Sequence, residues 1–183
     1  MRFLRLLLLL PAAAVLARAE PRLDIDSANS RVEVDVKATV DSFTGHLEHF
    51  APAVTVADDG HVTGARFAFQ FTDLKTGKPK RDQAMHDWQQ TPQFPDGEFV
   101  LGKLTKGAEN QYTAEGTLRL HGVTQPISFP LSIIVDRDVY ALDGDAVVDT
   151  RKFGLPIIRM MVVIKVDPEV HVRFHLQGRK VNG

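Results

Sequence analysis

Hydrophobic and polar residues alternate along most of the chain. In RVEVDVKATV, from Arg31 to Val40, the valines and Ala38 occupy one parity, and charged or polar residues occupy the other. Because successive side chains of a strand point to opposite faces, this segment is predicted to be a half-buried strand. Further segments with the same period begin at Phe43, His61, Gly97, Gln111, Pro126, Tyr140 and Glu169. Turn-forming residues separate them, so the pattern predicts an all-β fold, an antiparallel barrel or sandwich of about eight strands.

The segment LRLHGVTQPISFPLSI predicts two of these strands and the turn that joins them. We interpret HGVTQP as the link, in which Gly122 supplies backbone freedom. The apolar residues expected to share the inner face of this hairpin are Leu118, Leu120, Ile127, Phe129, Leu131 and Ile133.

One stretch has a different period. In KRDQAMHDWQQTP, the residues Ala84, Met85 and Trp88 lie at helical spacing, and Pro92 prevents continuation. We therefore predict a short helix near residues 82–90. The segment GLPIIRMMVVIKV, from Gly154, is apolar without regular alternation, and its path is left open.

The N-terminus has the features of a secretory signal peptide. Two arginines precede the leucine run that ends at Leu10, and Ala17-Arg18-Ala19 fits a cleavage site between small residues. We expect cleavage after Ala19 and one domain over residues 20–183. The apolar run is too short for a spanning helix, which needs about 20 apolar residues. The sequence thus predicts an exported protein without a transmembrane anchor.

Charge and cysteine content narrow the function classes further. The full chain has a formal net charge of −1, and loss of the three signal-peptide arginines makes the remainder more acidic. Such a chain is a poor candidate for binding nucleic acid. It contains no cysteine, so disulfides and thiol chemistry are excluded.

The polar residues show no established catalytic motif. His46 and His49 point to opposite faces of a strand, and His171 and His175 are about 13 Å apart along one, too far for a shared metal. Asp143, Asp145 and Asp149 share a strand face, which we interpret as solvent-exposed, although paired carboxylates also occur in glycosidases. We predict no metal, no cofactor and no catalytic residue.

Several motifs resemble the YceI-like polyisoprenoid-binding proteins of bacteria. They are SFTGHLEHF, the pair Arg81-Asp82 that opens RDQAMHDW, FPDGEFVLGKL, GTLRLHGVTQPISFPLSI and DTRKFGL. In this resemblance His121 and Gly122 match the hairpin link of the family, and Arg151, Phe153 and Gly154 match its R-x-F-G element. The stretch QQTPQFPDGEF departs from the usual family pattern.

The resemblance implies an extended lipocalin-like barrel around an apolar tunnel for an isoprenoid lipid, such as a polyprenyl phosphate or a quinone. It also implies a periplasmic location and frequent homodimerisation. We expect Arg81 and Arg151 to contact the lipid head group; the alternative for Arg81-Asp82 is a structural ion pair at the helix entrance. The residues expected to line the tunnel are Phe67, Phe69, Met85, Trp88, Phe99, Leu118, Leu120, Phe129 and Phe153.

We therefore predict a carrier of isoprenoid lipid with no catalytic step. Two alternatives stay open at this point. One is a hydrolase acting on small lipids or sugars through the aspartates or histidines, which requires these side chains to converge on one pocket. The other is a packed barrel that works as a protein-interaction module.

Overall fold

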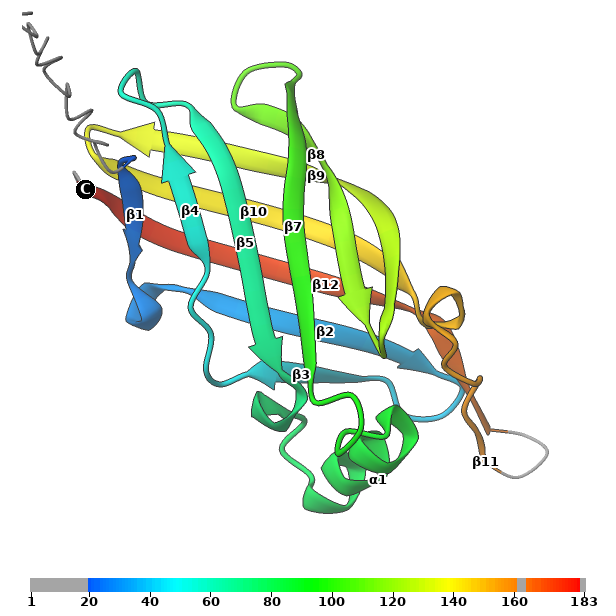
Figure 1. Cartoon of the computed structure of the whole chain (residues 1–183). Helices are drawn as coiled ribbons and strands as arrows, with labels where there is room; N and C mark the ends of the chain where they lie inside the picture. The colour runs from blue at the N-terminus through cyan, green and yellow to red at the C-terminus, as the bar shows by residue number, and fades with distance from the viewer. Residues whose placement is uncertain (1–19, 161–163, 182–183) are drawn as a thin grey trace, which may run out of the picture.

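A computed structural model of the protein describes residues 20–160 and 164–181, and strands dominate it (Figure 1). The strands are β1 (Arg22–Ile25), β2 (Arg31–Ala38), β3 (Phe43–Leu47), β4 (Ala53–Val56), β5 (Val62–Gln70), β6 (Leu74–Lys75), β7 (Asp96–Lys106), β8 (Gln111–Leu120), β9 (Val123–Asp136), β10 (Val139–Asp149), β11 (Arg159–Met160) and β12 (Ile164–Val181). The helices are α1 (Pro79–Gln89) and the 3-10 turns η1 (Ser27–Asn29), η2 (Phe71–Asp73) and η3 (Thr150–Phe153).

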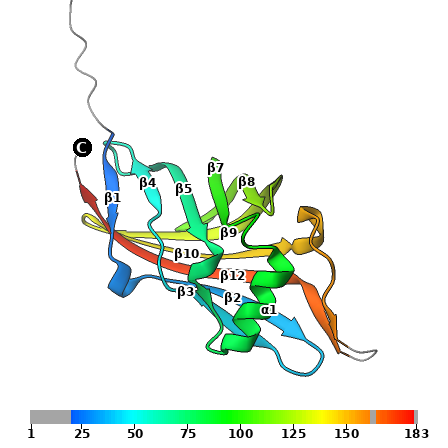
Figure 2. The same cartoon turned by 60° about the horizontal axis from the view of Figure 1, so that its bottom comes forward.

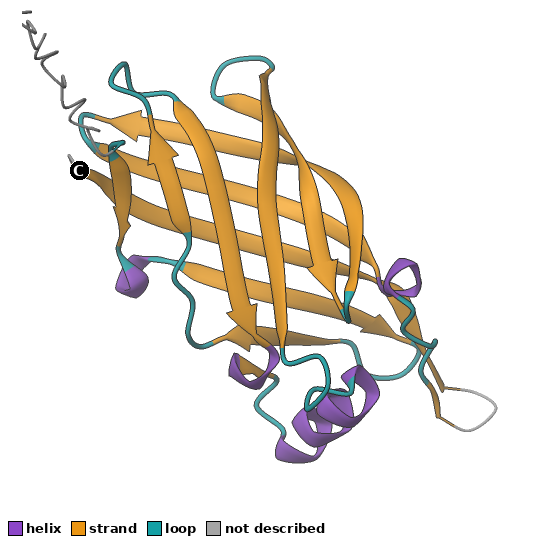
Figure 3. Ribbon diagram, viewed as in Figure 1, coloured by secondary structure: helices purple, strands orange, loops and turns teal. Residues whose placement is uncertain are grey.

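Eight of the strands close into a barrel. Their order is β1-β4-β5-β7-β8-β9-β10-β12, and β1 pairs with β12 to complete the ring. The C-terminal part of β12 pairs with β1, and an earlier part of the same edge pairs with β2. Strands β3 and β6 follow β2 in the sheet. All pairings are antiparallel, which confirms the predicted antiparallel barrel with one short α-helix (Figure 3).

The hairpin of β8 and β9 is tighter than the sequence suggested. Leu120 pairs directly with Val123, so the turn consists of His121 and Gly122 alone, with φ values of 48° and 72°. Positive φ at both positions is typical of the two-residue turns that match strand twist. The predicted six-residue link HGVTQP is therefore wrong, because its last four residues already belong to β9.

Alternate side chains of the long strands point into the barrel, as their periodicity predicted. On β8 and β9 the inward set includes Leu118, Leu120, Phe129, Leu131 and Ile133, all buried. The inner faces form two apolar clusters. The first cluster is centred on residues of β9 and β10 such as Phe129, Leu131 and Leu142, and the second consists of Leu118, Leu120, Val148 and Phe153.

The two ends of the barrel differ. Helix α1 lies across one end, which we call the α1 end (Figure 2). The opposite end is bounded by the turn between β4 and β5. There the buried Tyr140 donates its hydroxyl hydrogen to Gly60 O at 2.9 Å, and Lys180 Nζ donates to Ala57 O and Asp58 O at 2.9 and 3.0 Å. Burial raises the pKa of Tyr140.

The helix predicted near residues 82–90 is α1, which begins earlier because Pro79 suits a first helical turn. It ends where Gln90 adopts the left-handed conformation, with φ 54°. The segment whose path was left open continues from Gly154 to β11, which forms a short hairpin with the start of β12 outside the barrel (Figure 1).

Within residues 20–160 and 164–181, no helix is long and apolar enough to cross a membrane. The predicted signal peptide, residues 1–19, lies outside the described residues.

Candidate functional site

Two rows of aromatic rings line the barrel interior. The first follows β5: the rings of Phe67 and Phe69 lie 6.1 Å apart, and the row continues to Phe71 at 5.3 Å. Phe50 extends it from the other side, 6.1 Å from Phe67. The second row crosses between strands. The ring centroids of Phe99 on β7 and Phe129 on β9 lie 5.4 Å apart, and those of Phe129 and Phe174 on β12 lie 5.9 Å apart with the two rings nearly perpendicular.

Glycines in the barrel wall hold several of these rings close to the backbone. Gly97 on β7, Gly116 on β8 and Gly144 on β10 lie on the inner parity of their strands. A Cβ atom at any of them would collide with a phenylalanine ring: Phe69 at Gly97, Phe99 at Gly116 and Phe174 at Gly144. Each ring thus fills the space that a side chain at the glycine would need.

Burial of the inner face is uneven around the barrel. On β9 and β10 the inward residues are mostly buried, for example Phe129, Leu131 and Leu142. On β5, β7 and β12 the inward aromatic residues keep accessible surface, although they pack against the same clusters. The partly exposed rings are those of Phe67, Phe69, Phe99 and Phe174. An eight-stranded barrel is the size at which the interior either fills with side chains or holds a small ligand.

The residues expected to line a tunnel fall into connected groups. Phe67, Phe69, Met85, Phe99 and Phe129 lie in or against the first cluster. Leu118, Leu120 and Phe153 belong to the second cluster, and Phe69 and Phe99 contact both.

Trp88 is placed differently from the other predicted residues. Its indole Nε1 donates to Pro156 O at 2.8 Å, which ties α1 to the segment after η3.

The two arginines expected near a head group both have carboxylate partners. Arg81 Nη2 lies 2.8 Å from Asp41 Oδ2, and its guanidinium group stacks 4.0 Å above the ring of Phe43. Asp82 instead accepts from Thr76 N and Oγ1 at 2.9 and 2.6 Å, so the alternative of an Arg81-Asp82 ion pair is wrong.

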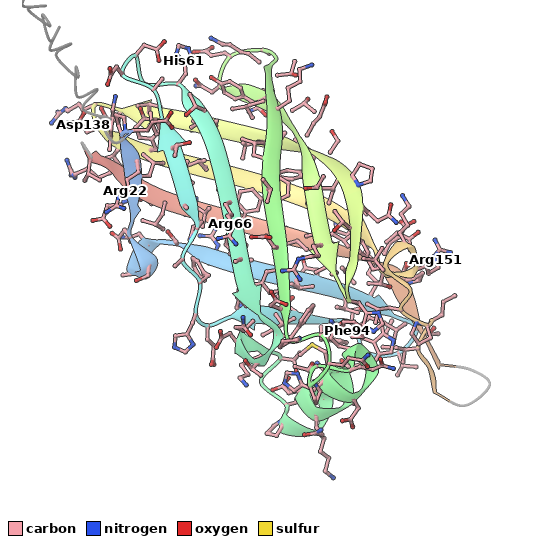
Figure 4. All side chains as sticks on the ribbon, viewed as in Figure 1. Arg22, His61, Arg66, Phe94, Asp138 and Arg151 are labelled. Carbon is pink, nitrogen blue, oxygen red and sulfur yellow. The ribbon has the colours of Figure 1, made fainter. Side chains whose placement is uncertain are left out.

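Arg151 lies in η3 (Figure 4), is exposed and forms a bidentate contact with Asp149, at 2.8 and 2.9 Å. The Arg151 guanidinium lowers the pKa of Asp149.

The outer face of β10 and β12 carries histidine and aspartate pairs. His175 Nδ1 lies 2.7 Å from Asp143 Oδ1, and His171 Nδ1 lies 3.1 Å from Asp145 Oδ1. Both aspartates border a shallow depression of about 340 Å³, together with Ser132. Strand β10 separates Ser132 on β9 from His175 on β12, so the two residues are roughly two strand spacings, about 9.5 Å, apart. A serine nucleophile therefore has no histidine base within reach here, and this geometry does not favour the hydrolase alternative.

Another depression, of about 620 Å³, borders the α1 face that carries Gln83, His86 and Asp87. The residues expected to line a tunnel border neither depression. Among the described residues, no group of three His, Cys, Asp or Glu side chains could hold a metal ion.

Phe174 is an interior residue that the sequence predictions did not include. Its position was recoverable, because in EVHVRFHLQG it shares the parity of Val170, Val172 and Leu176.

Comparisons with known proteins bear on this barrel. The family described as YceI-like domain matches residues 23–178. A search of curated proteins found no significant match.

Three solved structures share the fold. BcnA of Burkholderia cenocepacia is 19% identical with a TM-score of 0.75, over 84% of this chain and 99% of BcnA. A polyisoprenoid-binding domain from Saccharophagus degradans, implicated in plant cell wall breakdown, is 16% identical with a TM-score of 0.66, over 88% and 99% of the two chains. The YceI protein of Campylobacter jejuni is 12% identical with a TM-score of 0.64, over 79% and 87%.

Proposed function

Because the chain belongs to the YceI-like family, we propose that it binds an isoprenoid lipid, with the prenyl tail inside the barrel and the head group near one end. The protein acts in this proposal as a carrier or scavenger and performs no catalytic step. The similar domain from Saccharophagus degradans is described as polyisoprenoid-binding, which supports the class of ligand.

The observation that carries the proposal is the partial exposure of the inward aromatic rings of β5, β7 and β12. Apolar rings that face an interior and still keep accessible surface have not found enough protein partners to cover them. A prenyl chain would cover them without requiring polar contacts. At about 0.8 kcal/mol for each buried CH2 group, two or three isoprene units contribute roughly 8 kcal/mol before the cost of association.

The α1 end is the better candidate for the mouth of this site. At the opposite end, the hydrogen bonds from Tyr140 and Lys180 fasten the turn between β4 and β5. At the α1 end, the interior is covered by side chains of one helix, among them Met85. A helix that packs through a few apolar side chains separates from a barrel more readily than a strand of its wall.

Arg81 on α1 and Arg151 on η3 stay candidates for contacts with the head group. Their present carboxylate partners mean that either arginine would have to share its guanidinium group with Asp41 or Asp149. Export is likewise part of the proposal and is supported by the signal-peptide features of residues 1–19, whereas the periplasmic location and dimerisation are supported only by the family resemblance.

The proposal is tested by purifying the protein from bacterial cells without detergent and analysing an organic extract by mass spectrometry. We expect a prenyl lipid in stoichiometric amount. A lipid-free extract from folded, monodisperse protein would contradict the proposal and favour the packed interaction module.

A matched pair of variants links the lipid to the interior. Phe69→Asp places a charge on the inner face of β5, whereas Ala68→Asp places the same charge on the exposed outer face of the same strand. We expect Phe69→Asp to lose the lipid and Ala68→Asp to retain it, with circular dichroism confirming that both are folded. Phe67→Ala provides an uncharged second test if Phe69→Asp does not fold.

A further inference from the structure

Phe94, which lies close to α1 (Figure 4), contacts one polar side chain from α1 and one from the turn between β8 and β9. Gln89 in the last turn of α1 is only 1% exposed. Phe94 O lies 3.5 Å from Gln89 Nε2, and the Phe94 ring lies 4.0 Å from the ring of His121. We call Gln89, Phe94 and His121 the Phe94 cluster.

Two atoms of this cluster have no hydrogen-bond partner among the described residues. They are Gln89 Oε1 and His121 Nε2, and both are fully buried. A buried polar atom without a partner destabilises a protein, because it has lost its hydrogen bonds to water without replacing them. A methionine or leucine at position 89 would avoid this cost, so the glutamine indicates a partner from outside the chain.

The neighbours of the cluster determine that both atoms are acceptors. His121 Nδ1 lies 3.2 Å from Phe153 O, and because a carbonyl oxygen can only accept, Nδ1 carries the hydrogen. In this tautomer the lone pair of the ring is on Nε2. Gln89 Nε2 faces another carbonyl, that of Phe94, which orients the amide so that Oε1 is the free atom.

The acceptors lie next to the apolar interior. Leu120 and Phe153, the chain neighbour and the hydrogen-bond partner of His121, both belong to the second cluster. Met85, one turn before Gln89, packs against the first cluster. A lipid whose tail occupies the barrel can therefore bring its head group to this position.

We propose that the Phe94 cluster receives a neutral head group that donates a hydrogen bond to one of the two acceptors, namely a hydroxyl of a prenyl alcohol or of a prenylated hydroquinone. This inference rests on the proposed function. A quinone carbonyl or a phosphate dianion is itself an acceptor and would leave Gln89 Oε1 and His121 Nε2 unpaired. The cluster thus selects the reduced or alcohol form over the oxidised or phosphorylated form.

The test compares lipids with one tail and different head groups. The purified, delipidated protein is titrated with radiolabelled geranylgeraniol, with its methyl ether and with geranylgeranyl phosphate. We expect the alcohol to bind about tenfold more tightly than the ether, which cannot donate, since one good hydrogen bond is worth roughly that factor. A prenylated hydroquinone and its quinone, compared in the absence of oxygen, show whether the reduced form, which donates, binds more tightly than the oxidised form.

Two variants assign the effect to the cluster. Gln89→Met removes the acceptor at similar volume and should reduce the advantage of the alcohol over the ether without weakening the ether. Gln83→Met, the same substitution at an exposed position of α1, should leave the advantage unchanged. If Gln89→Met does not fold, His121→Asn tests the second acceptor, because asparagine tolerates positive φ.

The outcomes separate the two proposals. Equal binding of alcohol and ether by the unaltered protein overturns the head-group inference, with water as the partner of the cluster, and leaves the proposed function intact. Binding of none of the lipids overturns the proposed function itself. An unchanged preference in both Gln89→Met and His121→Asn excludes the Phe94 cluster as the source of selectivity.

Discussion

The ring of Phe174 on β12 covers Gly144, its direct cross-strand neighbour on β10. The same ring is nearly perpendicular to that of Phe129, with their centroids 5.9 Å apart. The glycine thus determines how close to the wall one aromatic side chain of the second row can lie. A larger side chain at Gly144 therefore tests whether the space inside the barrel depends on this contact.

Gly144→Val should force Phe174 away from the wall and into the barrel. We expect the free energy of unfolding to fall by about 1–3 kcal/mol, as for other enlargements of a packed site. Lipid binding should weaken because the displaced ring occupies the interior. Urea unfolding and lipid titration check both effects.

The control for this prediction is Ala141→Val, the same side chain on the outer parity of β10, which we expect to change stability by less than about 0.5 kcal/mol. If both variants lowered the free energy of unfolding equally, β10 would be sensitive to added side-chain volume on either face, and contact with Phe174 would not explain the loss.

Phe129 and Phe67 should respond differently to truncation. Phe129 is buried between Phe99 and Phe174, so Phe129→Ala is expected to destabilise the protein by about 3–5 kcal/mol. Phe67 is partly exposed, so Phe67→Ala should cost less than half of that and act mainly on lipid affinity. Urea unfolding measures the loss of stability, and lipid titration measures the loss of affinity, for each variant. A larger stability loss at Phe67 than at Phe129 would argue for a filled interior.

Arg81 can be tested as a structural residue or as a head-group contact. Arg81→Met removes the ion pair with Asp41 and the stacking on Phe43, which together should be worth about 1 kcal/mol. If its role is structural, the affinity for geranylgeraniol and for geranylgeranyl phosphate stays unchanged. A selective loss of phosphate binding would instead identify Arg81 as a head-group contact. Asp41→Asn serves as the control, since it breaks the ion pair and keeps the cation.

Asp35 links stability to acidic pH. The Thr44 hydroxyl, which donates to its carboxylate at 2.6 Å, and then the Arg173 guanidinium hold the pKa of Asp35 below its ordinary value of about 3.9. A folded-state pKa below the unfolded one stabilises the protein above about pH 4, and this contribution is lost as the pH falls through the folded value.

Asp35→Asn should therefore be less stable than the unaltered protein at pH 7, and its stability should depend less on pH between about 5 and 2.5. Thr44→Val, which removes the first cause, should show an intermediate dependence. Urea midpoints measured across this range provide the check. Parallel pH profiles for all three proteins would exclude Asp35 as a contributor.

Much of the architecture was predictable from local patterns. The alternation in RVEVDVKATV anticipated β2, whose inward residue Val32 is buried and whose outward residues Glu33 and Asp35 form ion pairs. The helical spacing of Met85 and Trp88 anticipated α1. The inner parity of Phe67, Phe69, Phe99 and Phe129 followed from the same period of two, because the direction of a strand side chain depends only on its neighbours in the chain.

Contacts between distant segments were not predictable in this way. The pairing of β1 with β12 closes the barrel between the two ends of the domain, and Arg81 finds Asp41 rather than the adjacent Asp82. The burial of Gln89 and the placement of His121 against Phe94 likewise depend on where α1 docks. The sequence by itself determined strand faces and the apolar inner surface, since these follow from local geometry. Only the tertiary structure decided closure, ion-pair partners and the two unpaired acceptors, because these depend on how the whole sheet brings remote residues together.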